Sequence, residues 1–379
     1  MKIVHFTLGS VNPNSSNGIN RVIEGHAKFV NDIDSSEVHV ITLKNKQKEK
    51  VKIIKRDGFD VTIFNSLINV IYYLRRRKDS IDLVHLHNVW SIQNIIISKA
   101  LNAYSIPFVV TVHAGLMEDR VKDSNYFFKL LFQFFFQKKH LNEASAIHAI
   151  AREEMTNISQ YCSNQNIFYL PNGIETNKVY SVKEKLENEK IRIGYLGRLS
   201  EEKNIIGLIN AISKLDNKTL KEIQLIIMGP IKNKYAHLCI DLVKKLELDK
   251  TIVFDGKVDS DKKWHKLSQL DIYIQVSFSE GASLTILEAM QCGLPLILSR
   301  TCNISYLHGQ EFLEMVEPLP SDISRAIQKA VNNIGPFKES GKKAHNFIVK
   351  ELNWKHIAQG LIAIYAEIIN KKKLKKTFQ

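Results

Sequence analysis

Two glutamates bracket the start of an amphipathic stretch in the second half of the chain. Glu280 precedes a glycine, and Glu288 lies within a run whose apolar residues recur at helical spacing, with Ser283 placed to cap the helix. A helix start beside a glycine offers free N–H groups and a positive dipole end, which suit a diphosphate. Ionised carboxylates suit hydroxyl-rich ligands, because each accepts two hydrogen bonds from a diol. The alternative is two ordinary surface glutamates beside a helix.

A second stretch, Gly194–Asn204, combines glycine with positive charge. It is typical of a strand, a glycine turn and then a helix from about Asn204, with Arg198 and Lys203 on the turn. Two cations at such a turn can neutralise a diphosphate leaving group. Basic residues in turns are often merely solvated, so this stretch alone does not decide between the two interpretations.

Both stretches belong to a chain in which short β-rich runs alternate with helical patterns. Such alternation predicts βαβ units, and two sets of runs predict two Rossmann-like, doubly wound α/β domains with parallel sheets. The strands are expected at Ile3–Leu8, Val38–Leu43, Asp82–His87, Phe108–His113, Ala146–Ala151, Ile191–Leu196, Ile223–Met228, Thr251–Phe254, Asp271–Val276 and Pro295–Leu298. Turn residues at Leu170–Gly173 and the charged stretch Asn177–Lys190 indicate a seam between the domains.

Taken in order, the motifs of the second half resemble those of the retaining glycosyltransferase family 4, whose members have the two-domain GT-B fold. The family pattern is Gly-Arg-Leu-x-x-x-Lys-Asn, a strand ending in Gly, Phe-x-Gly, a strand reaching Ser-x-x-Glu-Gly, and Glu-Ala-Met-x-x-Gly-x-Pro. This chain matches it at Gly197–Asn204, Met228–Pro230, Phe254–Gly256, Asp271–Tyr273, Ser277–Gly281 and Glu288–Pro295. The family's C-terminal helix is matched by Trp354 and Ile357–Ile369. The resemblance covers essentially the whole chain, and it is most specific in the second half.

The resemblance implies two domains that face each other across a cleft, with the donor nucleotide mainly on the second domain. Arg198 and Lys203 would hold the β-phosphate and stabilise the charge that builds as the glycosidic bond breaks. Glu280 would contact the transferred sugar, and Glu288 would bind the ribose hydroxyls. Because protein cations and a helix dipole neutralise the phosphates, no divalent metal is required, and a plausible Asp-x-Asp metal motif is lacking.

The same resemblance places main-chain groups against the donor. The backbone of Ala282, Ser283 and Leu284 would approach the phosphates or the sugar, and Gly197 and Gly229 complete the donor-binding set. Many family members have Phe-Gly-Leu or a similar triplet after Glu-Gly, so the Ala-Ser-Leu of this chain bears on which sugar fits.

The first half would supply the opposite wall of the cleft. Gly18, in the polar loop Asn12–Asn20, would let the backbone approach the diphosphate, although Asn17 replaces the first of the two glycines common in the family. His113, at a strand end, is expected near the donor sugar in an orienting or polar stabilising role, and His87 is expected to line the acceptor cleft. The alternatives are a glycine in a surface turn and strand-end histidines with structural roles.

The aromatic and basic stretch Tyr126–Lys139 predicts a helix that is apolar on more than one face. One interpretation packs this helix on the first sheet. The other lets it dip into a membrane surface, helped by the cations at Arg75–Lys78. The net charge of +14 favours anionic partners, but no recognition helix or stacking motif supports nucleic acid.

The cysteine content and the lengths of the apolar runs indicate the kind of compartment in which the protein works. Four scattered cysteines without C-x-x-C spacing argue against a disulfide framework or a zinc cluster and fit a reducing compartment. No run approaches the length of a membrane span, and Met1–Leu8 is typical of a first buried strand rather than a signal peptide.

We therefore expect a retaining glycosyltransferase that moves a hexose-type sugar from a UDP-sugar or GDP-sugar. The expected acceptor is a polyprenyl-diphosphate-linked saccharide in bacterial O-antigen or capsule assembly, and the expected location is the cytoplasm or the inner face of its membrane. Residues 1–170 would bind the acceptor, 171–190 would link the domains, 191–355 would bind the donor, and 356–379 would form a helix returning to the first domain and a basic tail. The alternatives are an inactive homologue acting as a sugar-nucleotide-binding or partner-binding scaffold, a GT-B sugar-nucleotide epimerase, and a nucleic-acid-binding protein.

Overall fold

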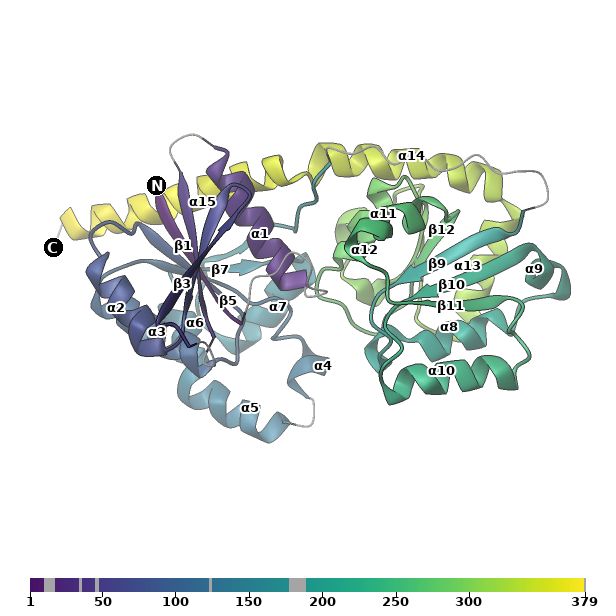
Figure 1. The fold of residues 1–379 in the computed structure, drawn as a ribbon, viewed down its shortest axis with the longest axis horizontal. Coiled ribbons are helices and arrows are strands. Elements are labelled where there is room, and N and C mark those ends of the chain that lie inside the picture. Colours follow the sequence, from purple (N-terminus) through teal and green to yellow (C-terminus); the bar gives the residue numbers. More distant parts are fainter. Residues whose placement is uncertain (10–17, 34–35, 45–47, 123–124, 177–188, 378–379) are drawn as a thin grey trace. The chain divides into compact units, whose positions relative to one another are not determined.

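The chain divides into two compact units, each built on one β-sheet (Figure 1). The computed structural model describes residues 1–9, 18–33, 36–44, 48–122, 125–176 and 189–377. Unit 1 comprises Met1–Gly173 with Trp354–Gln379, and unit 2 comprises Ile174–Asn353. Most of the stretch expected to link the domains, residues 177–188, lies outside the described residues.

Unit 1 carries the elements from β1 to β8 and the last helix. They are β1 Lys2–Leu8, α1 Gly18–Asn31, β2 Glu37–Leu43, β3 Val51–Arg56, β4 Phe59–Phe64, α2 Leu67–Arg76, β5 Leu83–His87, α3 Ile92–Ala103, β6 Phe108–Thr111, α4 Glu118–Val121, α5 Tyr126–Phe132, η1 Gln133–Gln137, α6 Lys138–Glu143, β7 Ala146–Ala149, α7 Arg152–Tyr161, β8 Ile167–Tyr169 and α15 Trp354–Thr377. The strand order is β3-β4-β2-β1-β5-β6-β7-β8.

The sheet of unit 1 is parallel except at one edge, where β3 runs antiparallel to β4. The sheet is therefore parallel, as expected, with one antiparallel strand at its edge. The two strands are joined by Asp57 and Gly58, and Gly58 has a φ of +82°. An Asp-Gly pair between β-rich runs is a strong hairpin signal, because glycine adopts positive φ without steric cost.

Two apolar layers cover the sheet of unit 1, one on each face. Successive strand residues point to opposite faces, so Ile3 packs with α1 and α15 while Val4 packs with α2 and α3. On the first face α1 and α15 lie side by side. Trp354, at the start of α15, comes so close to Gly25 of α1 that a Cβ there would lie 2.2 Å from the indole ring.

Unit 2 contains the remaining elements. They are β9 Ile191–Leu196, η2 Glu201–Lys203, α8 Ile205–Ile212, α9 Asn217–Glu222, β10 Ile223–Met228, α10 Lys234–Lys245, β11 Ile252–Gly256, α11 Ser260–Ser268, β12 Ile272–Gln275, α12 Leu284–Gln291, β13 Leu296–Ser299, η3 Arg300–Cys302, η4 Ser305–Leu307, β14 Leu313–Val316, α13 Pro320–Asn332 and α14 Ile334–Glu351. The strand order is β11-β10-β9-β12-β13-β14, with all pairs parallel.

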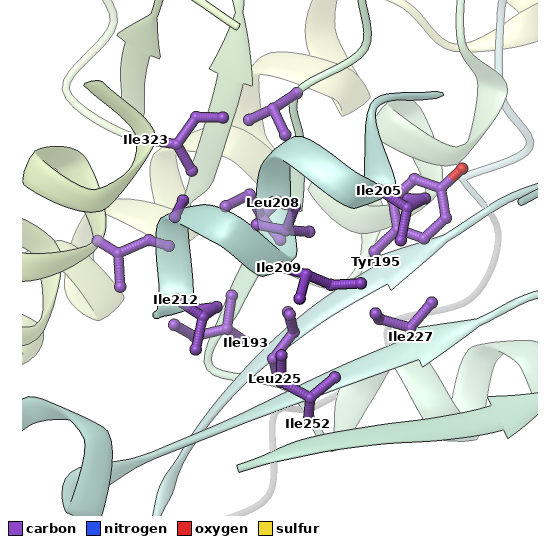
Figure 2. Packing of buried hydrophobic residues seen from close by; sticks show 14 of the residues in the cluster. Ile193, Tyr195, Ile205, Leu208, Ile209, Ile212, Leu225, Ile227, Ile252 and Ile323 are labelled. Atoms are coloured by element: carbon purple, nitrogen blue, oxygen red, sulfur yellow. The ribbon is translucent and has the colours of Figure 1, made fainter. Parts of the chain in front are cut away.

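The core of unit 2 forms between its sheet and the helices α8, α10 and α13 (Figure 2). Strand residues such as Ile193 and Leu225 pack against Leu208 and Ile212 of α8 and Ile323 of α13. Numbered along the chain, the strands follow the order 3-2-1-4-5-6 of a doubly wound fold, in which the direction of winding reverses between β9 and β12. Ligands of such sheets bind outside the carboxyl ends of the strands at this reversal.

The structure confirms the α/β fold class and all ten expected strands, with shifted ends. One expected strand, Phe108–His113, stops at Thr111, and His113 has a φ of +50°. Gly18 is the first described residue of α1 rather than a loop residue, and residues 12–17 of its expected loop lie outside the described residues. The strands β3, β4, β8 and β14 were not predicted.

The stretch Tyr126–Lys139 is helical, but it does not pack its aromatic side chains on the sheet. Phe134 is 77% exposed and Phe135 is 61% exposed, whereas Gln137 is fully buried. Gln137 accepts a hydrogen bond from the backbone N–H of Trp90 at 2.9 Å, and Gln133 donates to the carbonyl of Tyr161 at 2.6 Å. The interpretation of a helix with its aromatic side chains in the core was therefore wrong, because the glutamines face inward. A search of the described helices finds none with the length and apolarity needed to traverse a bilayer.

Candidate functional site

Most of the predicted site residues lie at one edge of unit 2, where its parallel strands end. The loop after β9 carries Arg198 and Lys203, the loop after β12 carries Glu280, and Gly229 follows β10. Because carboxyl ends of parallel strands share one edge, residues far apart in sequence come together here.

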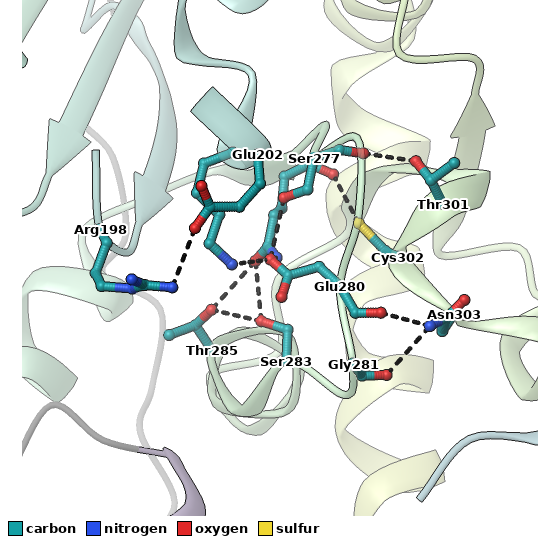
Figure 3. A network of polar contacts seen from close by, with 12 residues as sticks. Arg198, Glu202, Ser277, Glu280, Gly281, Ser283, Thr285, Thr301, Cys302 and Asn303 are labelled. Carbon is teal, nitrogen blue, oxygen red and sulfur yellow. Dashed lines mark hydrogen bonds and ion pairs between the residues drawn. The ribbon is translucent and has the colours of Figure 1, made fainter. Parts of the chain in front are cut away.

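Lys203 and Glu280 form the centre of a polar network (Figure 3). Their side chains are an ion pair between Lys203 Nζ and Glu280 Oε1, and they are only 13% and 7% exposed. The same carboxylate oxygen accepts hydrogen bonds from Gln275 Nε2 and from Ser277 Oγ at 3.0 Å. An oxygen with three donors is held in one position, so Glu280 in turn fixes the ammonium group of Lys203.

Arg198 stands in a different environment from Lys203. Its side chain is 63% exposed and pairs with Glu202 at 3.1 Å. Its carbonyl accepts a hydrogen bond from the buried Tyr195 hydroxyl at 2.7 Å, which anchors the backbone while the guanidinium stays in solvent. An exposed ion pair contributes little stability, so this guanidinium can exchange Glu202 for an anionic ligand at small cost.

Asn204 joins the two loops that carry these residues. It has a left-handed backbone, with φ of 56°, and separates η2 from α8. Its side-chain amide donates to the carbonyl of Val276 at 3.1 Å and to that of Pro318 at 3.0 Å. A further bond runs from the N–H of Phe278 to the carbonyl of Glu202 at 2.8 Å. These bonds set the spacing between Lys203 and Glu280.

A third loop, after β13, is hydrogen-bonded to the loop that carries Glu280. Ser299 donates to the carbonyl of Ser277 at 2.7 Å. The amide of Asn303 donates to the carbonyl of Glu280, and the N–H of Glu280 donates to the carbonyl of Thr301 at 3.1 Å. The backbone on both sides of Glu280 is therefore hydrogen-bonded to a neighbouring strand end.

The start of α12 presents unused donors beside this network. Ser283 occupies the N-cap position, as expected, but its side chain does not cap the helix. It donates instead to Gln275 Oε1 at 3.1 Å. Within the described residues, no acceptor takes the backbone N–H groups of Ala282, Ser283 and Leu284. Free N–H groups at a helix start suit an anion.

Glu288, inside α12, is fully buried and pairs with Lys263 of α11, Oε1 to Nζ, at 2.6 Å. The ammonium of Lys263 lies 4.8 Å from the ring centroid of Trp264. A buried carboxylate with a neighbouring cation can accept hydrogen bonds from a diol, provided the cation stays to balance its charge. Lys263 therefore belongs to the candidate site as the charge partner of Glu288, although the sequence pattern did not indicate it.

The two predicted donor-binding glycines permit close packing of the strand ends. A Cβ at Gly229 would lie 2.0 Å from the carbonyl oxygen of Gly197, and a Cβ at Gly197 would lie 2.5 Å from the Tyr195 hydroxyl. Their N–H groups are already used: Gly197 donates to Met228 at 2.9 Å and Gly229 to Gly256 at 2.8 Å. At these two positions glycine therefore allows close packing and hydrogen bonding of the backbone.

The predicted residues of the first half lie in unit 1. His87 is buried at the end of β5, and its Nδ1 lies 3.0 Å from Nε2 of His113. Burial lowers the pKa of His113 to about 3 and holds the pKa of His87 well below its usual value, so both are neutral near pH 7. Neutral imidazoles orient and hydrogen-bond rather than supply positive charge.

Glu154, at the start of α7, holds the loop that carries His113. Its carboxylate accepts hydrogen bonds from the N–H groups of Ala114 and, at 2.7 Å, Ile150. Both His113 and Ala114 have positive φ, a conformation that needs such support. Sequence reasoning missed Glu154, because a single glutamate two residues into a helix carries no distinctive pattern.

The structure thus brings some predicted residues together and leaves others apart. Lys203 contacts Glu280, and His87 contacts His113. Arg198 and Glu288 make ion pairs with other partners, and Gly18 is an exposed helix-start residue. Gln275, Asn303 and Lys263 were missed. Polar residues at the ends of β12 and β13 were the available signal for the first two.

The fold of the chain is that of several solved enzymes. Sucrose-phosphate synthase from Thermosynechococcus elongatus superposes with a TM-score of 0.82 at 16% identity, covering 98% of this chain and 99% of that chain. HepE from Anabaena, solved in complex with UDP and glucose, superposes with a TM-score of 0.74 at 15% identity, covering 97% and 100%. At such identities the likeness concerns the fold.

Two family models match consecutive parts of the sequence. The one described as Glycosyltransferase Family 4 matches residues 16–178, and the one described as Glycosyl transferases group 1 matches residues 177–348. Both models describe glycosyltransferases, and together they span residues 16–348 of this chain. The Lys203–Glu280 network lies in the part matched by the group 1 model, and His87 and His113 lie in the part matched by the other model.

The curated proteins that are similar to this chain are distant from it in sequence. MJ1069 of Methanocaldococcus jannaschii, described as an uncharacterized glycosyltransferase, is 28% identical over 225 residues, which cover 56% of each chain. TuaC of Bacillus subtilis, a glycosyltransferase named for teichuronic acid biosynthesis, is 24% identical over 261 residues, covering 66% of this chain and 61% of TuaC. The alignments with the first three curated relatives cover between 41% and 65% of those proteins' own length.

Proposed function

We propose that this protein is a retaining glycosyltransferase that moves a hexose-type sugar from a UDP-sugar or GDP-sugar to a lipid-linked saccharide. The observation that carries the proposal is the Lys203–Glu280 pair beside the free N–H groups of α12, with the exposed Arg198 on the adjoining turn. Positive charge and free donors at a strand edge suit a diphosphate, and the paired carboxylate suits a hydroxyl-rich sugar.

In the proposed reaction the C1–oxygen bond to the diphosphate breaks while a bond from C1 to the acceptor oxygen forms on the same face. The acceptor hydroxyl gives its proton to an oxygen of the departing diphosphate, so no dedicated protein base is needed. Arg198 and Lys203 stabilise the negative charge that develops on the leaving group. Glu280 acts by position, since its Oε1 accepts three hydrogen bonds that hold the carboxylate beside Lys203.

The donor class rests on this geometry and on the chemistry of solved relatives. HepE was solved with UDP and glucose, which supports a uridine or similar nucleotide donor here. Glu288 binds the ribose hydroxyls and Lys263 balances its charge. Protein cations and a helix dipole do the work that a divalent ion would do at the diphosphate, so donor binding is independent of magnesium.

The acceptor proposal rests on two surface properties and on one relative. TuaC is named for teichuronic acid biosynthesis. The outward aromatic side chains between Phe127 and Phe136 and the net charge of +14 suit an anionic membrane surface. The enzyme would then work at the cytoplasmic face of the membrane and meet a polyprenyl-diphosphate-linked saccharide there.

Binding and turnover of nucleotide sugars test this proposal directly. A panel of UDP-sugars and GDP-sugars is screened by thermal shift and calorimetry, with and without magnesium, in the wild type and in Lys203→Met. We expect one nucleotide class to bind the wild type equally in both buffers and to bind Lys203→Met much more weakly. Binding that requires magnesium would contradict metal independence, and equal binding by the variant would contradict the assigned site.

The chemical outcome separates the remaining alternatives. With acceptor present, NMR of the product should show the anomeric configuration of the donor sugar, because transfer occurs on one face. An inverted product would contradict the retaining mechanism. Conversion of the donor to an epimer without acceptor would indicate an epimerase, and donor binding without any turnover would indicate a scaffold.

A further inference from the structure

Unit 1 contains a buried group of histidines that the proposed reaction does not use. His5, His26, His85, His87 and His148 are each at most 1% exposed. Adjacent rings lie close together, with centroids 4.9 Å apart for His5 and His85 and 5.8 Å apart for His5 and His26. Neutral imidazoles are good ligands for zinc and similar ions.

Strand register places these side chains on one face of the sheet. His5 of β1 is directly paired with His85 of β5. The residues on either side of His5 and His85 in their strands belong to the apolar layer on the opposite face of the sheet. The side chains of His5 and His85 therefore point toward α1 and α15. α1 contributes His26 and α15 contributes Tyr365, and both side chains are fully buried. Four elements from distant parts of the chain therefore converge on one point.

A chain of hydrogen bonds fixes the proton positions on His85. The carbonyl of Leu170 only accepts, so His148 Nε2 donates to it at 2.8 Å and His148 Nδ1 carries a lone pair. The Thr111 hydroxyl must then donate to His148 Nδ1, at 2.9 Å, and accept from His85 Nε2. His85 Nδ1 is left with its lone pair, and that lone pair faces the hydroxyl of Tyr365.

His5 is oriented in a similar way. Its Nδ1 lies 2.9 Å from Nε2 of His87, and its Nε2 lies 3.5 Å from the hydroxyl of Tyr365. Metal-binding histidines commonly use one ring nitrogen for the ion and bond the other to a neighbouring group that holds the ring in place. To bind an ion, His85 Nδ1 would give up the hydroxyl proton of Tyr365, and His5 would carry its proton on Nδ1, the nitrogen that faces His87.

His26 provides the independent observation. Both of its ring nitrogens are buried without a hydrogen-bond partner among the described residues. A neutral imidazole must carry a proton on one of them, so the folded chain leaves a buried N–H and a buried lone pair unused. Its ring centroid lies 5.8 Å from that of His5 and 6.2 Å from that of His85. An ion between these rings would use the nitrogen that the protein alone leaves unsatisfied.

We propose that His5, His26 and His85 bind one Zn²⁺ ion, with the hydroxyl of Tyr365 as the fourth ligand. One nitrogen from each of the three rings lies within 4.8 Å of the other two. Zinc–nitrogen bonds of about 2.0–2.1 Å place tetrahedral ligands roughly 3.4 Å apart. Binding would therefore draw the three ring nitrogens together and move the Tyr365 hydroxyl away from His85 Nδ1, which is 2.5 Å from it without the ion. Loss of the Tyr365 proton on binding leaves one positive charge on the site instead of two.

The site has a structural role and is separate from sugar transfer. It would join β1, β5, α1 and α15, and so tie the C-terminal helix to the first strand of unit 1. A four-ligand site without an open position matches structural rather than catalytic zinc. The sequence gives no sign of it, because its ligands do not follow a recognisable spacing.

Metal binding by the full-length protein tests the proposal. Purified protein is stripped with a chelator and titrated with Zn²⁺, with binding followed by calorimetry, metal content by mass spectrometry and stability by thermal melting. We expect one ion per chain and a rise of several degrees in the melting temperature. His26→Leu should bind at least about 100-fold more weakly and gain no stability from Zn²⁺. Tyr365→Phe should weaken binding by at least about tenfold.

Two comparisons keep the test decisive even if a variant alters stability. His39→Gln removes a histidine outside the group, one that bonds to Thr62, and should bind Zn²⁺ as the wild type does. Without metal, His26→Leu should melt at a higher temperature than the stripped wild type, because it lacks the unsatisfied buried nitrogens. Equal zinc affinity in the wild type and His26→Leu, or no stoichiometric binding by the wild type, would overturn the proposal.

Discussion

At the residue scale, the two cations of one motif stand in different surroundings. Arg198 is mostly in solvent, whereas Lys203 is nearly buried against Glu280. A buried ion pair adds little net stability, because both charges lose their hydration. The role of the Lys203–Glu280 pair is therefore better explained by preorganisation. The carboxylate of Glu280 holds the ammonium group of Lys203 at the strand edge before the diphosphate binds.

The Lys203–Glu280 pair allows a double-mutant test. Lys203→Met leaves the buried carboxylate without its cation and should lower the free energy of unfolding by roughly 3–5 kcal/mol. Adding Glu280→Gln removes the stranded charge and should recover much of that loss, while activity stays absent. Urea unfolding and donor turnover of both variants measure the effect. A double variant less stable than Lys203→Met would show that the pair itself is not the source of the cost.

Gly229 makes a sharper residue-scale prediction. A Cβ there would overlap the carbonyl oxygen of Gly197 at 2.0 Å, so Gly229→Ala should lower the free energy of unfolding by about 2 kcal/mol or more. Gly335, in α14, has nothing within 4 Å of its Cβ position, and Gly335→Ala should be neutral or slightly stabilising. Chemical denaturation compares the two. If Gly229→Ala were as stable as Gly335→Ala, close packing would not explain this glycine.

At the element scale, the strand-end loops are held by side chains from neighbouring elements rather than by their own sequence. Asn204 bonds the loop after β9 to the end of β12, and Asn303 bonds the loop after β13 to the loop of Glu280. In unit 1, Glu154 of α7 does the same for the loop of His113. Such supports hold the functional groups in place, as a preorganised site requires.

Because Glu154 titrates, we expect the free energy of unfolding to depend on pH. Burial raises the pKa of Glu154 from 4.5 to about 7, so between these values the folded state holds a proton that the unfolded state has lost. The free energy of unfolding therefore falls as pH rises through this window and levels off above about pH 7, by up to about 3 kcal/mol in all. Glu154→Gln does not titrate and should lack this part of the fall.

The measurement is urea unfolding of the wild type and Glu154→Gln at several pH values from about 5 to about 8. The difference in stability should shift in favour of Glu154→Gln as the pH rises. A constant difference across the range would show that the carboxyl is already ionised in the folded protein at pH 5.

At the scale of the whole molecule, the outward aromatic side chains of α5 and η1 are unusual. Phe127, Phe128, Phe134 and Phe135 are each more than 60% exposed. A soluble monomer seldom gathers large apolar side chains on one surface without a partner. Lys129, Lys138 and Lys139 lie on the same helical stretch, which suits a negatively charged lipid surface.

Vesicle binding tests this surface. We expect the wild type to sediment with vesicles that contain anionic lipid and to be released by salt. The variant Phe134→Ser with Phe135→Ser should bind at least about tenfold more weakly, because burying one phenylalanine side chain contributes about 2 kcal/mol. Leu238→Ser, which removes a residue 55% exposed on α10, should bind unchanged. Equal binding by all three proteins would exclude this surface as the contact.

The architecture and many of the site's residue types can be predicted from local sequence patterns. Alternating β-rich and helical runs fix two doubly wound units, because a parallel strand needs a crossover and an apolar face on both sides. The glycine turn at Gly197 and the helix after Gly281 also follow from local patterns. The Asp57–Gly58 hairpin is equally local, because an Asp-Gly pair joins two β-rich runs, but it was not predicted.

The contacts between residues far apart in the chain follow from the three-dimensional fold alone. The partners of Glu280 come from sequence separations as large as 77 residues, and the ligands proposed for zinc come from the first strand and the last helix. No local pattern encodes such contacts, because they depend on strand order and register. The buried face of the Tyr126–Lys139 helix could not be predicted from the sequence either. When a helix is apolar on several faces, its sequence does not indicate which face packs against the sheet.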